Sequence, residues 1–311
     1  MSSNKEKYRL LCETEGSRIP LFQQYWWMET VCRGKQWDVL LAERKDGAVE
    51  GALPYLYGSK YGIRYILQPE LTQFSGPWYN ADDDDLDFQM RVGGDLVAQL
   101  EALGIRAYIQ HFSPSITNWL PFYWKGYRQT TRYTYRFPSL ANPDELFRKA
   151  SRVRRRHMDE VAAACTVDTG LSPEEFAVFH KDYYLRRGGH DFTPQGLILN
   201  VCHAALARQQ GVLWGLRSHD DRLQAGWFVA YDDNCGYSLL LAIGPDAPPN
   251  AMTYLMWQVL RHLSPLTRAF DFEGSMEPGT ELFYRTFSTV QTPFFEVTKF
   301  RPGLLRMAFP V

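Results

Sequence analysis

The sequence is poor in the features that mark disulfide-rich and metal-binding proteins. Its 311 residues include 5 cysteines, an odd number, and none of them forms a Cys-x-x-Cys pair. This pattern argues against both a disulfide framework and a structural zinc site. The 7 histidines show no ligand spacing either. We therefore expect no metal.

Long apolar runs and a charge surplus are also missing. No segment sustains the uncharged stretch that a transmembrane helix needs, and the amino terminus is charged where a secretory signal would be apolar. These absences predict a cytoplasmic protein without a membrane span. The formal net charge is −1, so the whole-chain charge gives no reason to expect DNA as a partner.

What the chain does contain is a repeated order of elements. Alternating apolar residues predict a strand at Val39–Glu43, a tight turn at Asp46-Gly47 and a return strand at Val49–Leu56. The same pattern recurs at 212–217 and 223–231. Each hairpin is followed by a predicted strand, helix, strand, helix and strand. The sequence thus predicts two tandem α/β modules, each with a mixed sheet.

We place the N-terminal module at residues 1–140 and the C-terminal module at 141–311. The second module begins with a helical insertion at 141–194. Asn142 followed by proline and two acids is a helix start, and it predicts one long helix through Ala164. Ser172-Pro173-Glu174-Glu175 has the capping-box pattern and starts another helix.

The stretch Phe270–Phe287 is the candidate site. It reads as a buried strand, a glycine-bounded turn and a helix. This order brings Asp271 and Glu273 from the strand beside Tyr284 from the helix. Either carboxylate can take a proton from an ammonium group, directly or through water. The alternative role for both is to hydrogen-bond the turn that follows.

Two further groups of side chains have both a functional and a structural interpretation. The arginines of the basic run 148–157 either bind donor phosphates, with Arg154 and Arg155 as candidates, or form a solvated helix face. In the second case they pair with neighbouring acids, which are Asp144, Glu145, Asp159 and Glu160. The aromatic residues Trp78, Tyr123 and Trp124 either bind a sugar or peptide substrate or pack in a core.

The element order and two motifs carry a resemblance to a known family. Phe-Asp-Phe-Glu-Gly-Ser at 270–275 and Phe-Tyr-Arg-Thr-Phe-Ser at 283–288 resemble the GNAT (Gcn5-related N-acetyltransferase) superfamily. Within it, the tandem layout is similar to the FemAB-like peptidyltransferases and their acetyltransferase relatives. The resemblance implies an acyltransferase that moves an acyl group, typically acetyl from acetyl-CoA, to an amine. The acceptor would be a small molecule or peptide, with a link to the cell envelope.

The resemblance also implies roles for individual residues. The donor chain would follow the strand 235–243, with Leu241 and Ile243 beside it. The donor phosphates would meet the start of the next helix, where free backbone N–H groups favour anions. That start comprises Asn250, Ala251, Met252 and Thr253. Tyr284 would protonate the leaving thiolate, although Ser288 stands where the family usually has glycine.

The phosphate loop departs from the family pattern, and this departure leads to two alternative functions. The phosphate loop contains Pro245, Pro248 and Pro249, which lack N–H donors, and the negatively charged Asp246. A FemAB-like aminoacyl transferase would instead use aminoacyl-tRNA on a peptidoglycan precursor, although a tRNA partner is less favoured without a basic surplus. A non-catalytic binding protein on the same scaffold is the other alternative. In the first module, the acidic run 82–85 would repel donor phosphates.

Overall fold

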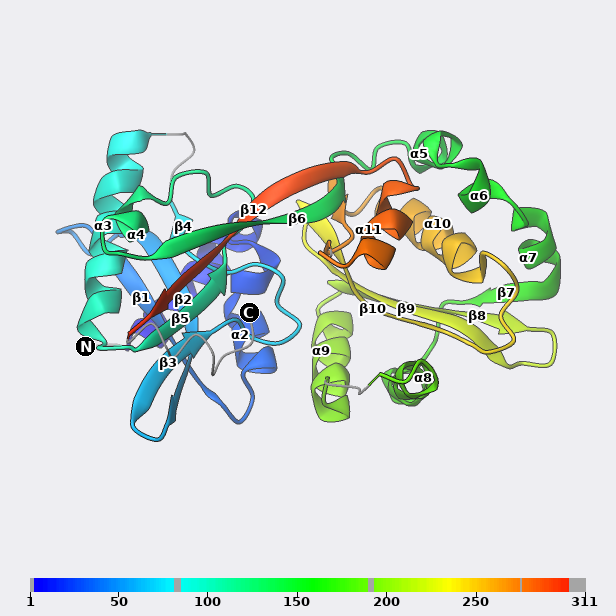
Figure 1. Cartoon of the computed structure of the whole chain (residues 1–311), viewed down its shortest axis with the longest axis horizontal. Helices are drawn as coiled ribbons and strands as arrows, with labels where there is room; N and C mark the ends of the chain where they lie inside the picture. Colours follow the sequence, from blue (N-terminus) through cyan, green and yellow to red (C-terminus); the bar gives the residue numbers. More distant parts are fainter. Residues whose placement is uncertain (1–2, 81–84, 190–192, 275, 302–311) are drawn as a thin grey trace. The chain divides into compact units, whose positions relative to one another are not determined.

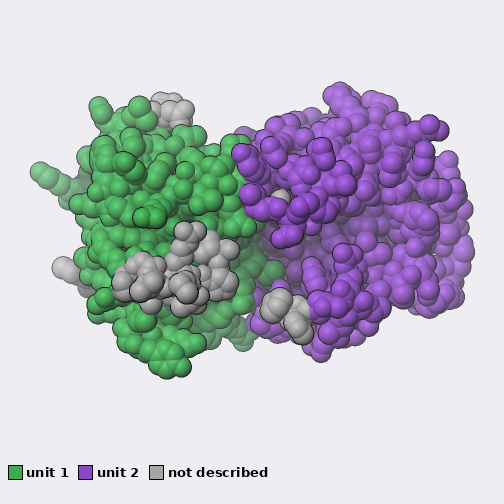
Figure 2. Space-filling view, in the orientation of Figure 1, with its two compact units in different colours: residues 1–132, 293–311 green, residues 133–292 purple. Residues whose placement is uncertain are grey.

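The computed structural model describes residues 3–80, 85–189, 193–274 and 276–301, and the chain divides into two compact units. Unit 1 comprises residues 1–132 and 293–311, and unit 2 comprises residues 133–292 (Figure 2). The chain passes from unit 1 to unit 2 within β6 (Arg128–Phe137) and returns within β12 (Val290–Phe300). Within the described ranges, no helix is long and apolar enough to cross a membrane.

Unit 1 combines a sheet with helices that precede and follow its hairpin. Its helices are α1 (Asn4–Glu15), α2 (Tyr25–Val31), α3 (Leu86–Ala102) and α4 (Leu120–Tyr123), with short 3-10 helices η1 (Gly16–Arg18) and η2 (Leu21–Gln23). Its strands are β1 (Gln36–Glu43), β2 (Val49–Lys60), β3 (Ile63–Leu67), β4 (Trp78–Tyr79) and β5 (Ala107–His111).

Unit 2 has the same plan with additional helices at its start. Its helices are α5 (Pro143–Lys149), α6 (Arg152–Arg155), α7 (Met158–Ala164), α8 (Pro173–Arg186), α9 (Gln195–Ala207), α10 (Ala251–Leu263) and α11 (Pro278–Arg285). Its strands are β7 (Cys165–Asp168), β8 (Gly211–Ser218), β9 (Leu223–Tyr231), β10 (Cys235–Ile243) and β11 (Ala269–Asp271). Helices α8 and α9 lie on one face of this sheet and α10 on the other (Figure 1).

The repeated element order confirms the predicted tandem α/β fold. Two helices, a hairpin, a strand, a helix, a strand, a helix and a strand follow one another from α1 to β6 and again from α8 to β12. Both sheets are mixed, since β3 pairs in parallel with β5 and β10 with β11, while the hairpins are antiparallel. The segment from α5 to β7 has no counterpart before α1 among the described residues, whereas the helical insertion predicted at 141–194 also includes α8, which corresponds to α1. The bounds of the insertion remain a prediction.

The last strands of the two copies are exchanged. β12 pairs with β5 through residues 296–300, and β6 pairs with β11 through residues 136–137. The sheet order is β1-β2-β3-β5-β12 in unit 1 and β6-β11-β10-β9-β8-β7 in unit 2. The compact units therefore differ from the modules predicted at 1–140 and 141–311, because each sheet is completed by a strand from the other copy. The predicted boundary between the two sequence repeats, at residues 140 and 141, remains a prediction.

The prediction of one helix from Asn142 to Ala164 was wrong. Asn142 does cap α5, since its side chain accepts a hydrogen bond from the Glu145 N–H at 3.1 Å. The helix then ends because Ala150 is extended and the Ser151 N–H donates to the Thr286 carbonyl at 2.8 Å. A second break follows at His157, which has a φ of 63°. Contacts made by the folded chain thus divide the segment into α5, α6 and α7.

Helix α1 was not predicted, although Ser3 and Glu6 carry its start signal: the Ser3 hydroxyl accepts a hydrogen bond from the Glu6 N–H at 3.3 Å. Of the acidic run 82–85, only Asp85 lies within the described residues, and its side chain caps α3 at the Phe88 N–H. The other three acids lie outside them, as does Ser275.

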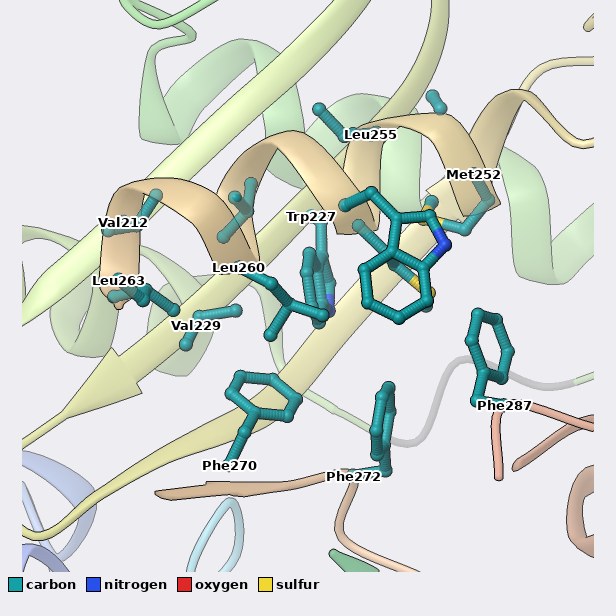
Figure 3. Close-up of a cluster of buried hydrophobic side chains, with 14 of the residues drawn as sticks. Val212, Trp227, Val229, Met252, Leu255, Leu260, Leu263, Phe270, Phe272 and Phe287 are labelled. Atoms are coloured by element: carbon teal, nitrogen blue, oxygen red, sulfur yellow. The ribbon is translucent and has the colours of Figure 1, made fainter. Parts of the chain in front are cut away.

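The core of unit 2 explains how β11 presents a polar side chain. Phe270 and Phe272 are fully buried and pack with Trp227, Leu260 and other apolar side chains of α10 and β9 (Figure 3). Burial of one large aromatic side chain contributes about 2–3 kcal/mol. Because successive strand residues point to opposite faces, the residue between the two phenylalanines is directed away from this core. That residue is Asp271.

Candidate active site

The carboxylate of Asp271 is fully buried and only partly satisfied. Its Oδ1 accepts hydrogen bonds from the Thr134 hydroxyl and from the Glu273 N–H, the latter at 2.8 Å. Arg136 Nε lies 3.4 Å from Oδ2, but Oδ2 has no hydrogen-bond partner among the described residues. Burial raises the pKa of Asp271 to about 6, against the opposing effects of Thr134, Arg136 and the Glu273 N–H.

Glycine at position 274 allows the turn after β11 to lie directly on β6. The Gly274 N–H donates to the Thr134 hydroxyl oxygen at 3.0 Å, and the Phe272 N–H donates to the Tyr135 carbonyl at 2.9 Å. A β-carbon at Gly274 would overlap the backbone of Tyr133 and Thr134. The turn is thus fixed by the strand that unit 2 receives from the first copy.

Glu273 adopts a left-handed backbone conformation, with a φ of 56°. Its Oε1 atom is buried and has no hydrogen-bond partner among the described residues. Burial and the neighbouring charge of Asp271 raise the pKa of Glu273 well above its ordinary value. Because two neighbouring buried carboxylates cannot both be charged at low cost, the protonated form of Glu273 is favoured.

Tyr284 lies on α11 and is 8% exposed. Its ring packs against Phe272 and Tyr135, with centroid distances of 5.1 and 6.1 Å. Burial raises the pKa of Tyr284, and the charges of Glu273 and Asp271 raise it further. The phenol is therefore neutral at physiological pH and can donate a proton. The structure thus brings the predicted Asp271, Glu273 and Tyr284 into one neighbourhood.

Tyr284 opens into a pocket of about 550 Å³ within unit 2. A pocket of this size is typical of sites for small ligands. Its lining from β10, α10 and α11 comprises Leu241, Ile243, Met252, Thr280, Phe283 and Tyr284. Leu241, Ile243, Met252 and Tyr284 were all predicted as site residues, and they share this one cavity. Asp271 and Glu273 are not among the lining residues.

The pocket is lined by the part of β10 that extends beyond its pairing with the short strand β11. β10 pairs with β11 only through residues 235–237, whereas it pairs with β9 along residues 236–243. The register of the β9 pairing shifts between Ser238 and Leu240, which marks an irregularity in β10. Beyond Tyr237, no strand in the described part of the chain pairs with the edge of β10 that faces β11. An extended ligand can therefore pair with this edge, although the carbonyl of Ile243 at its end already accepts a hydrogen bond from Arg186.

The start of α10 matches the prediction only in part. Met252 lines the pocket, whereas Ala251 and Thr253 are buried. Asn250 is engaged elsewhere, because its side-chain amide donates to the carbonyl groups of Val153 and Arg156 at 2.8 and 3.2 Å. It ties the start of α10 to the insertion and forms no side-chain cap for the helix.

Arg154 and Arg155 do not line the pocket. Arg154 donates through Nε to the Thr286 hydroxyl at 2.8 Å, and its guanidinium lies 4.5 Å from the ring centroid of Phe283. Arg155 donates to the carbonyl of Ala150 at 3.0 Å. Arg154 is thus a packing residue between α6 and α11, and its role with donor phosphates remains a prediction.

The alternative pairing of the basic run with nearby acids occurs only in part. Glu145 pairs with Lys149 and Glu160 with His157, both within the run, whereas Asp144 pairs with Arg261 outside it. Among the described residues, Arg152 and Arg156 form no ion pair, because the breaks between α5, α6 and α7 remove the spacing that a continuous helix would provide.

The aromatic candidates all belong to unit 1 and have different environments. Trp78 is buried, and its indole N–H donates to the Arg18 carbonyl at 2.9 Å. Tyr123 and Trp124 are exposed, and Tyr123 contacts Trp119 with a centroid distance of 5.4 Å. Trp78 therefore has the core role, while substrate contact by Tyr123 or Trp124 remains a prediction.

Sequence reasoning missed the contribution of α8 to the pocket. Tyr183 and Arg187, at the end of this helix, line it together with Glu277 and Gly279. The Arg-Arg-Gly-Gly sequence at 186–189 indicates a helix end, but no local pattern shows which cavity that end would face. Among the described residues, no group of three or more histidine, cysteine, aspartate or glutamate side chains could hold a metal ion.

Comparisons with known proteins agree with this fold. Residues 146–278 match the family model of the acetyltransferase (GNAT) domain. A search of curated proteins finds no match. The fold is similar to the crystal structure of FemX, with a TM-score of 0.69, 14% identity and coverage of 99% of this chain and 98% of that one.

Two other solved structures share the fold. One is the C-terminal domain of a putative lysylphosphatidylglycerol synthetase from Agrobacterium fabrum, with a TM-score of 0.57, 13% identity and coverage of 98% and 94%. The other is a tandem GNAT protein from the clavulanic acid biosynthesis pathway, with a TM-score of 0.55, 12% identity and coverage of 94% and 92%. Together with the match of residues 146–278 to the GNAT domain, they show that the chain has a tandem GNAT fold similar to that of FemX.

Proposed function

We propose that unit 2 is an N-acyltransferase that moves an acyl group, acetyl in the simplest case, from acyl-CoA to an amine. The observation that carries this proposal is the position of Tyr284 in the same pocket as the unpaired edge of β10. An extended amide chain such as pantetheine can hydrogen-bond to that edge as an added strand would. Leu241 and Ile243 then flank the chain, and Tyr284 lies near the thioester.

The acid and base roles follow from the pKa directions. The neutral amine attacks the thioester carbonyl, so that a C–N bond forms and the C–S bond breaks. The proton of the amine passes to Asp271, which is largely ionised at neutral pH because its pKa is about 6. Since Asp271 does not line the pocket, a water molecule carries this proton. Tyr284, whose raised pKa keeps it protonated, gives its proton to the thiolate.

Glu273 is the less suitable base. Burial and the charge of Asp271 raise its pKa well above the ordinary value, which favours the protonated form. The structure therefore favours Asp271 between the two candidates. The acceptor amine would belong to a small molecule or a peptide of the cell envelope, a proposal supported by the similarity to FemX.

An aminoacyl-tRNA donor is the second candidate. Two observations support it: the proline-containing loop before α10, and the absence of an ion-pair partner for Arg152 and Arg156 among the described residues. Exposed arginines of this kind can bind nucleic acid phosphates. The acceptor would then be a peptidoglycan precursor.

Calorimetry distinguishes these candidates. We expect acetyl-CoA to bind with a measurable heat. Leu241→Arg should bind acetyl-CoA more weakly, because the larger side chain would fill the pocket. Binding of a charged tRNA without binding of acetyl-CoA would support the second candidate. If neither ligand binds at high protein concentration, the chain is a binding protein on an acyltransferase scaffold and the proposal fails.

A further inference from the structure

Among the described residues that line the pocket, Arg187 is the only cation. It follows α8, and its guanidinium lies 5.5 Å from the ring centroid of Tyr183. One guanidinium N–H donates to the Tyr183 hydroxyl at 3.3 Å. Within the described ranges, no carboxylate pairs with Arg187, so most of its donors remain available to a ligand.

The neighbouring arginine holds this end of α8 in place. Arg186 donates to the carbonyl of Ile243, the last residue of β10, at 2.9 Å. It also pairs with Asp182 one turn earlier at 2.9 Å. Arg187 is therefore anchored next to the point where β10 leads into the loop before α10.

That loop offers few donors of its own. Three of its residues are prolines. The Gly244 N–H donates to the Gln224 carbonyl at 2.8 Å, and the Ala251 N–H donates to the Pro248 carbonyl at 3.0 Å. The Asn250 side chain is bonded to the insertion, as described above. An anionic ligand at the start of α10 thus needs a cation from another element.

We propose that Arg187 binds the phosphate groups of the acyl donor, in place of the N–H groups that the loop lacks. This inference rests on the proposed function for the identity of the donor, but its chemistry is a phosphate on a guanidinium. The phosphate could come from the pyrophosphate of CoA or from the acceptor end of a tRNA. The site thereby uses α8, which precedes the hairpin, to complete donor binding.

Binding of inorganic pyrophosphate tests the proposed phosphate site at Arg187, whichever acyl donor the protein uses. Calorimetry should show weaker binding to Arg187→Gln than to the wild type, by roughly 10-fold or more, as expected for the loss of a charge-assisted hydrogen bond. The matched control is Arg261→Gln, an exposed arginine that pairs with Asp144 outside the pocket. It should bind like the wild type. Equal affinities for the wild type and Arg187→Gln would overturn the inference.

Further titrations identify the source of the phosphate. If CoA is the donor, Arg187→Gln should weaken CoA binding while leaving pantetheine, which has no phosphate, unchanged. If tRNA is the donor, a short RNA ending in CCA should lose affinity instead. An equal loss for CoA and pantetheine would show a general disturbance of the pocket and overturn the inference. If pyrophosphate binds through Arg187 but CoA does not bind, the proposed acyl-CoA function is contradicted and the inference about Arg187 stands.

Discussion

Thr134 of β6 donates a hydrogen bond to the buried carboxylate of Asp271 on β11, across a sequence separation of 137 residues. The same hydroxyl accepts a hydrogen bond from the Gly274 N–H. Because Asp271 Oδ1 also accepts from the Glu273 N–H, it is fully engaged. Oδ2 is the oxygen left to take a proton.

The buried Asp271 should make stability depend on pH. Its pKa rises from 3.8 to about 6 on folding, so the folded state binds more protons between these values. Wild-type stability should therefore fall as the pH rises from below 4 to above 6, by about 3 kcal/mol in all relative to Asp271→Asn. Urea unfolding at several pH values measures this difference. Asp159→Asn, an exposed control on α7, should follow the wild type, and a constant difference for Asp271→Asn would contradict the raised pKa.

Thr134→Val should shift the acid limb of the pH–rate profile. The hydroxyl lowers the pKa of Asp271, so its removal should raise that pKa and move the midpoint from about 6 to higher pH. Thr134→Ser keeps the hydroxyl and should restore the wild-type profile. The measurement is kcat/KM against pH with saturating donor. An identical shift in both variants would show that the methyl group, and not the hydrogen bond, matters.

Tyr284→Phe should lower kcat by about 10²-fold or more, with little change in KM. The reason is that a proton donor to the leaving group acts in the transition state and not in substrate binding. Steady-state kinetics with acetyl-CoA measures both constants. Tyr231→Phe, a half-buried tyrosine of the same unit outside the pocket, is the control. Unchanged kcat in Tyr284→Phe would remove the phenol from the mechanism.

Gly274→Ala should destabilise unit 2 by roughly 2–3 kcal/mol, since overpacking against a backbone that cannot yield is costly. The added carbon would overlap Tyr133 and Thr134. Gly279→Ala is the matched control, because a β-carbon there meets nothing within 4 Å. Thermal unfolding of the two variants gives the comparison. Equal stability would mean that the turn does not lie closely on β6.

Arg154→Gln should lower the free energy of unfolding by about 1–2 kcal/mol, because it breaks the hydrogen bond to Thr286 and the contact with Phe283. The exposed Arg155→Gln should change it by less than about 0.5 kcal/mol. Denaturant unfolding of both variants tests this contrast. A large loss of pyrophosphate affinity in Arg154→Gln, without a loss of stability, would instead support a role in phosphate binding.

The sequence by itself determined the order of the elements from the first hairpin onward, except that it joined α5, α6 and α7 into one helix. The apolar periods and the Asp-Gly turn predicted the tandem hairpins, since these depend on neighbouring residues alone. Likewise, the alternation of Phe270, Asp271 and Phe272 was enough to predict that an acid and the Tyr284 helix would meet beside a strand.

Only the tertiary structure decided which strands complete each sheet and which arginine faces the pocket. A strand pattern specifies faces but not partners, so the exchange of β6 and β12 could not be read from it. The break at Ser151 depends on the Thr286 carbonyl, which lies far along the chain. Arg187 lines the pocket, whereas Arg154 packs against Phe283, which lines it. In both cases the position of the long side chain depends on packing between distant parts of the chain and not on local sequence.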